Sequence, residues 1–104
     1  MPQLNSSSEK PILNASITIS RKSFFGGAAI PFNIIIDGVS VGKVDNGKTV
    51  NIPFSSGLHK IYIKVPVWNR NNHTDEILVD LTNTQNIKFI CGYKAPNFVF
   101  LQKV

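Results

Sequence analysis

Apolar and polar residues alternate along much of the chain. Beginning at Ala15, the side chains of Ala15, Ile17 and Ile19 alternate with serine and threonine, and a period of two is typical of a strand that buries one face. Short apolar and often β-branched runs recur downstream, and no segment combines a helical period with capping residues. We therefore expect eight strands, at residues 15–20, 32–36, 39–44, 49–52, 58–65, 76–81, 87–93 and 98–103.

Turn-forming residues separate these runs. Asp37-Gly38 predicts a type I′ hairpin turn, which needs positive φ at both central positions, and aspartate tolerates this while glycine accepts it freely. Pro53 indicates that the strand before it ends there or lies on a sheet edge. Longer interruptions are expected at residues 21–31 (RKSFFGGAAIP) and at residues 66–75 (PVWNRNNHTD), which form the longest polar loop.

The spacing of the strands predicts the fold class. Seven or eight short, mostly antiparallel strands are typical of an all-β, immunoglobulin-like β-sandwich. The 104 residues suffice for one domain with one modest core. Residues 1–11 are polar and serine-rich, so we assign them to a flexible N-terminal tail and residues 12–104 to a single domain.

One long stretch resembles a known kind of domain. Residues 36–65, IDGVSVGKVDNGKTVNIPFSSGLHKIYIKV, contain a strand, a DG pair, a V-G, a short strand and a G-x-H that opens the next strand. This pattern resembles PEGA-like domains and other small bacterial β-sandwich domains of unknown function. The resemblance extends over residues 16–92, including RKSFFGG and IKFICG. It implies the fold and an extracytoplasmic or surface-associated setting, and it implies no catalytic residue.

The expected location follows from the N-terminus and the single cysteine. The first ten residues, MPQLNSSSEK, lack the apolar segment of a signal peptide, and no run approaches the ~20 apolar residues needed to cross a membrane. One cysteine excludes an internal disulfide framework. We expect the chain as written to be cytoplasmic, and extracytoplasmic if it is a trimmed fragment.

Candidate catalytic and metal-binding groups are few. His59 alternates in phase with Ile61 and Ile63, so we expect it to point inward at a strand start and to hydrogen-bond a turn carbonyl. His73 should be solvated in the polar loop, and Cys91 should be a small core residue. One cysteine and two separated histidines match no zinc spacing. We therefore expect a protein that is not an enzyme and has no metal or cofactor.

Two aromatic segments are candidate partner-binding sites. Trp68 and Arg70 stand among asparagines in the polar loop, where they could bind a glycan or a peptide, or Trp68 could cover the end of the core. Phe24 and Phe25 lie between a basic pair and two glycines. They either plug the open end of the sandwich or face a partner.

A basic face is the third candidate surface. Lys60, Tyr62 and Lys64 share one face of their strand, and with Lys88 nearby they could form a basic, aromatic-bearing strip that binds nucleic acid. The alternative is a solvated sheet face. The net charge of +5 favours an anionic partner or reflects only the composition of an A/T-rich genome.

The last strand is apolar on both faces. In FVFLQKV, residues 98–104, Phe98 and Phe100 share one face and Val99 and Leu101 the other. Such a strand is central or covered on both sides, so a second copy of the chain could cover it in a homodimer, unless the tail or the Phe24-Phe25 segment does so. We expect a non-catalytic binding or assembly module with a protein partner. The alternatives are an anionic polymer such as nucleic acid, or carbohydrate at the Trp68 loop.

Overall fold

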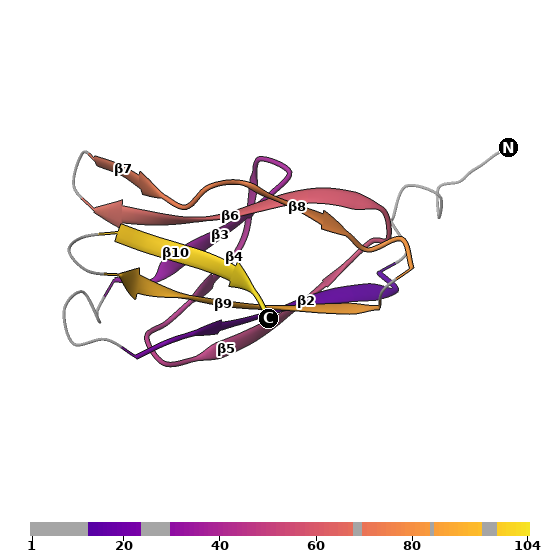
Figure 1. Ribbon diagram of the computed structural model, residues 1–104, viewed down its shortest axis with the longest axis horizontal. Coiled ribbons are helices and arrows are strands. Elements are labelled where there is room, and N and C mark those ends of the chain that lie inside the picture. The colour runs from indigo at the N-terminus through magenta and orange to yellow at the C-terminus, as the bar shows by residue number, and fades with distance from the viewer. Residues whose placement is uncertain (1–12, 24–29, 68–69, 84, 95–97) are drawn as a thin grey trace, which may run out of the picture.

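The structure is a computed structural model that describes residues 13–23, 30–67, 70–83, 85–94 and 98–104. These residues form an all-β fold whose described part contains nine strands and no helix (Figure 1). The strands are β2 (Ala15–Arg21), β3 (Phe32–Ile36), β4 (Val39–Val44), β5 (Thr49–Phe54), β6 (Leu58–Val67), β7 (Arg70–His73), β8 (Ile77–Asp80), β9 (Asn86–Lys94) and β10 (Phe98–Lys103). All eight expected strands are present, and β7 is additional.

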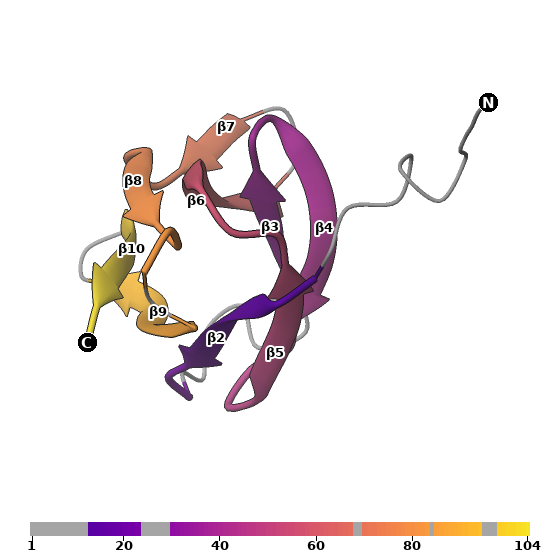
Figure 2. The same ribbon diagram turned by 90° about the vertical axis from the view of Figure 1, so that its right-hand side faces the viewer.

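The strands form two facing sheets. The order is β10-β9-β2-β5 in the first sheet and β4-β3-β6 in the second, where β7 and β8 follow one another along the far edge of β6. Every described pairing is antiparallel except that of β2 with β9. Viewed end-on, β4 lies beside β5 on one side of the molecule, and β7 and β8 lie across from β10 on the other (Figure 2).

One hydrophobic core fills the space between the sheets. Alternate side chains of the central strands point into it, because a period of two places every second residue on the same face. Burying each large side chain contributes about 1.5–3 kcal/mol. The largest fully buried side chains are Phe32, Phe89, Ile17, Ile19, Ile34, Ile36, Ile61, Ile63, Leu81, Val44, Val65 and Val79.

The predicted hairpin turn at Asp37-Gly38 is confirmed. Both residues have positive φ, 53° and 81°, as a type I′ turn requires. Pro53 also lies on a sheet edge as expected, although β5 continues through it to Phe54. An edge strand tolerates proline because the missing N–H has no neighbouring strand to reach.

Residues 66–75 were expected to be a loop, and this prediction is wrong for residues 66–67 and 70–73, which lie in strands. β6 continues to Val67, and β7 returns as its hairpin partner with Lys64 opposite His73. The sequence of β7, RNNH, has no apolar alternation. Because β7 occupies an edge and is held through the backbone ladder, its side chains need not supply a buried face.

The predicted break at Arg21 is also wrong, because β2 extends through it and buries it to 2% exposure. Arg21 Nη1 donates to the carbonyls of Ile30 (2.9 Å) and Val44 (3.1 Å). The guanidinium carbon lies 3.7 Å from the centre of the Phe32 ring, which is a cation–π contact. Burial lowers the pKa of Arg21, although an arginine keeps its charge in a protein.

Candidate functional site

The side chain of His59 joins two turns. As expected, it lies at the start of β6 and contacts a turn carbonyl, with Nε2 2.9 Å from the Ser55 oxygen. Its Nδ1 lies 2.7 Å from Oδ2 of Asp37, and the Lys60 amide donates to Oδ1 of Asp37 (2.9 Å). Asp37 therefore shapes its own turn and also connects the β3–β4 turn to the β5–β6 turn.

Both ring nitrogens of His59 face acceptors, so the arrangement favours the doubly protonated ring. Burial alone would lower the pKa of His59, but the bond to Asp37 and the carbonyls of Ser55 and Ser56 outweigh it and raise the pKa above 6.5. The Lys60 amide and then His59 lower the pKa of Asp37 below 3.8. The nitrogen that would act as a base in a catalytic triad is occupied by a carbonyl, so this geometry serves to hold the turns together.

The remaining cysteine and histidine side chains form no reactive or metal-binding cluster among the described residues. Cys91 is fully buried in the core, as expected, and burial raises its pKa to about 12. His73 is exposed but lies on β7 and not in a loop, with Nδ1 2.9 Å from the Thr74 carbonyl and its ring 5.6 Å from that of Tyr62. Within the described ranges, no three His, Cys, Asp or Glu side chains are grouped to hold a metal ion.

The expected basic strip is present in part. Lys60, Tyr62 and Lys64 occupy one face of β6, with both lysines exposed. The register adds a cross-strand row that the sequence did not reveal, since Lys43 lies opposite Asn33, Asn33 opposite Lys64, and Lys64 opposite His73.

Lys88 does not belong to the basic strip, which corrects the prediction. It is on β9, in the other sheet, where its register partner is Thr18. It is exposed and alternates with the buried Ile87 and Phe89, so it points away from the core on the opposite side of the molecule from Lys60. Proximity in sequence could not reveal this, because the assignment of strands to sheets is set by long-range pairing.

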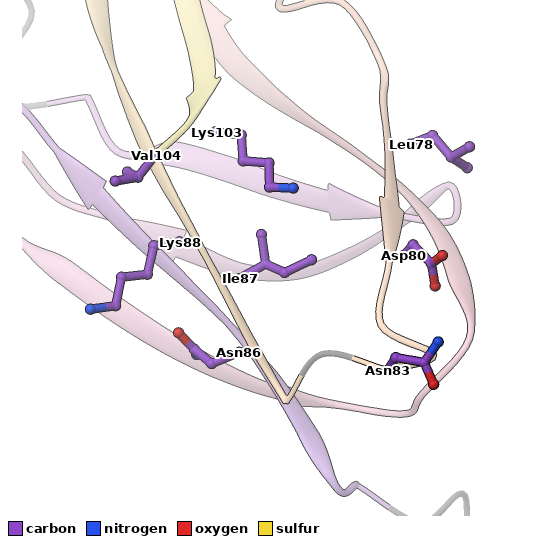
Figure 3. A pocket seen from close by; sticks show the side chains of 8 residues that line it. All are labelled: Leu78, Asp80, Asn83, Asn86, Ile87, Lys88, Lys103 and Val104. Atoms are coloured by element: carbon purple, nitrogen blue, oxygen red, sulfur yellow. The ribbon is translucent and has the colours of Figure 1, made fainter.

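A groove with a volume of about 490 Å³ lies where the two sheets separate. This volume is typical of ligand sites, which span ~300–1,000 Å³. In Figure 3 the side chains of Ile87 and Lys103 point toward β8 from the opposite sheet. We call this feature the β8–β9 groove, and it is lined by Leu78, Asp80, Asn83, Asn86, Ile87, Lys88, Lys103 and Val104.

The β8–β9 groove combines apolar and charged groups. Leu78 is 63% exposed and Val104 is 73% exposed, and two lysines but one aspartate lie along the groove. Sequence reasoning missed this site because its residues come from three separate strands. The only local signal is the alternation that places Lys103 in phase with Val99 and Leu101, which are directed inward.

The terminal strand β10 lies on a sheet edge and is not central. Leu101 packs against the core and is opposite Cys91, whereas Phe100 is opposite Gly92 on the outer face. A Cβ atom built on Gly92 would lie 3.2 Å from the Phe100 ring and 3.3 Å from Cβ of Lys22. The Phe100 ring therefore lies over the backbone of Gly92 on the outer face of the sheet.

The remaining predicted sites lie outside the described residues. This holds for the tail at residues 1–11, for Phe24 and Phe25, and for Trp68. The backbone of Arg70 forms part of β7, and its side chain is not among the described ones.

No family model, curated protein or solved structure matches this chain. None of the described residues forms a helix long and apolar enough to cross a membrane. The assignment of function therefore depends on the surfaces of this molecule itself.

Proposed function

We propose that this protein is a non-catalytic binding module whose partner is another protein. The observation that carries the proposal is the β8–β9 groove, where exposed Leu78 and Val104 lie beside Lys88 and Lys103. Apolar side chains with a polar rim are typical of protein-binding surfaces. An immunoglobulin-like topology and PEGA-like membership form part of this proposal, supported by the two facing sheets and by the DG turn at its expected place.

A second exposed leucine enlarges the apolar area beside the groove. Leu58 is 62% exposed and lies opposite Asp80, while Leu78 lies opposite Lys60. Leu58 and Leu78 are therefore diagonal neighbours on the same face of β6 and β8, close enough for long side chains to touch. Two adjacent exposed leucines extend the contact area that a partner would cover.

Photo-crosslinking tests the proposed function. Leu78→Cys is labelled with a benzophenone maleimide, and Cys91 should remain unlabelled because it is buried and its pKa is raised to about 12. Val39→Cys is the matched control, since Val39 is equally exposed, at 62%, on the opposite edge strand β4. The experiment uses an extract of the cells in which the protein is naturally made. The label at position 78 should form crosslinks to discrete proteins, and the label at position 39 should not.

Competition completes this experiment. Excess unlabelled wild-type protein should suppress the crosslinks from position 78, because a specific site saturates. Identical products from positions 78 and 39, or products that the competitor leaves unchanged, would contradict the proposal.

An anionic polymer is the second candidate partner. It is supported by the cross-strand row of Lys43, Asn33, Lys64 and His73 on β4, β3, β6 and β7. We expect any binding of single-stranded DNA to weaken steeply with salt, as counterion release requires. The double variant Lys60→Ala with Lys64→Ala should remove most of it. Fluorescence anisotropy with a labelled oligothymidylate measures this, and absence of binding at low salt would eliminate the candidate.

A further inference from the structure

The edge strand β8 offers unpaired backbone groups to the groove. In an antiparallel pair, alternate residues direct both N–H and C=O toward the partner strand. The Leu81 amide donates to the Gly57 carbonyl (2.7 Å), so Leu81 and Val79 face β6. Leu78 and Asp80 then direct their backbone groups to the other side, where no described strand pairs with β8.

These two residues are also the β8 residues that line the groove. The groove is thus bordered by a strand edge with donors and acceptors in the spacing of a sheet ladder. Such an edge is a template for an added strand.

The opposite border of the groove is β9 just beyond the end of β10. The Val104 amide donates to the Lys88 carbonyl (2.9 Å), so Lys88 faces the β10 side and Asn86, two residues earlier, faces the same way. The side chain of Asn86 is held away from the groove by bonds to Ser16 Oγ (2.6 Å) and Thr18 Oγ1 (3.1 Å). The backbone N–H and C=O of Asn86 therefore form the polar border of the groove on the β9 side.

The side chains around the groove specify the chemistry of an occupant. Lys103 points toward β8 from the edge strand β10, whereas the side chain of Lys88 points away from β8 (Figure 3). Lys103 is therefore the positive charge that faces the free edge of β8. On the β8 side, exposed Leu78 favours an apolar neighbour on the added strand. The groove therefore complements a strand whose side chains are acidic on one face and apolar on the other.

We propose that the β8–β9 groove binds an extended peptide that pairs with the free edge of β8 and places alternating acidic and apolar side chains beside Lys103 and Leu78. This inference rests on the proposed protein-binding function and adds to it the conformation and chemistry of the partner segment.

A library of synthetic heptapeptides tests the proposal. In one set, glutamate alternates with valine, isoleucine, leucine or phenylalanine, and in the matched set lysine replaces glutamate. We expect binders from the acidic set alone. Lys103→Glu should weaken them at least about tenfold, because it reverses a charge beside the acidic face. Lys48→Glu, an exposed lysine between β4 and β5, should have little effect.

Backbone pairing has its own measurements. Hydrogen exchange at the amides of Leu78 and Asp80 should slow when the best peptide binds, whereas exchange at Val39 should not. N-methylation of the peptide at one set of alternate residues should abolish binding, and N-methylation at the other set should be tolerated. Equal effects of both sets, or unchanged exchange at β8, would overturn the added-strand geometry.

The outcomes separate this inference from the proposed function. If Leu78→Cys crosslinks a competed partner and no acidic peptide binds, the inference is wrong and the protein-binding function stands. If crosslinking and the peptides both fail, neither holds. If Lys103 only protects the edge from pairing, a common use of inward lysines, then Lys103→Ala will increase self-association and Lys103→Glu will not alter peptide affinity, which also overturns the inference.

Discussion

Asp37 and His59 form a contact that should make folding stability depend on pH. The pKa of His59 is raised above 6.5, so its contribution is complete below about pH 6.5 and is lost as pH rises through the raised value. The pKa of Asp37 is lowered below 3.8, so its contribution is present above pH 3.8 and is lost as pH falls through the lowered value. The pair should stabilise the fold most between these limits.

The size of this effect is limited by exposure. The Asp37 side chain is 46% exposed and that of His59 is 11% exposed, so we expect less than about 1 kcal/mol. Asp37→Asn is the suitable variant, because asparagine also tolerates positive φ. Thermal unfolding from pH 3 to pH 9 should show the largest difference between wild type and variant near pH 5. A constant difference across this range would contradict the electrostatic role.

Gly92 should be required because the Phe100 ring lies over it. A Cβ atom there would already be in tight contact with Phe100 and Lys22, and valine adds two methyl groups. Gly92→Val should therefore destabilise the protein by about 1–3 kcal/mol. In the Phe100→Ala background the cost should fall, which a double-mutant cycle by urea denaturation measures. Equal costs in both backgrounds would show that the Phe100 contact is not the cause.

Single residues were predictable where the signal was local. The alternation of β6 predicted that His59 reaches a turn carbonyl, and the alternation of β9 predicted that Cys91 is buried. Arg21 continues the alternation of Ile17 and Ile19, but the expected break at residues 21–31 was based on the two glycines and the proline of that segment. The Asp37–His59 contact could not be predicted, because it joins residues 22 positions apart through the pairing of β3 with β6.

The β3–β4 hairpin should be sensitive to its turn. Gly38 has φ of 81°, and a Cβ atom added there would meet no other atom within 4 Å, so a substitution acts through backbone strain and not through a clash. Gly38→Val should cost about 1–3 kcal/mol, because β-branched residues are disfavoured at positive φ. Gly38→Asn is the control and should cost much less, since asparagine is tolerated there. Coincident urea midpoints for wild type and Gly38→Val would refute the requirement.

Strands with an apolar period and turn residues at both ends were predicted well. The bounds of β3, β4 and β10 match the expected ranges. β7 was missed because its sequence, RNNH, carries no apolar signal and its position follows from the backbone of β6. The order of strands in the sheets could not be predicted from the sequence either. The separation of Lys88 from Lys60 and the β8–β9 groove both depend on that order, so they could not be predicted.

The whole molecule has a free edge at β10 that could join two copies. Among the described strands, β10 pairs only with β9, and an edge strand carries unpaired N–H and C=O groups. A second β10 related by a two-fold axis would pair with this edge, beside the Phe100 ring that lies over Gly92. Lys103 belongs to β10 and also lines the β8–β9 groove, so a homodimer and a bound peptide strand would share this border.

Sedimentation velocity at micromolar concentration tests the homodimer. We expect the wild type to sediment as a dimer and Phe100→Lys to sediment as a folded monomer, because a charge would be placed at the covered outer face of β10. Leu101→Lys is a poorer test, since Leu101 packs against the core and its loss would also destabilise the fold. Asn51→Lys, on the opposite edge strand β5 of the same sheet, should remain dimeric. A monomeric wild type would exclude the dimer and would leave the apolar faces of β10 to be covered within one chain.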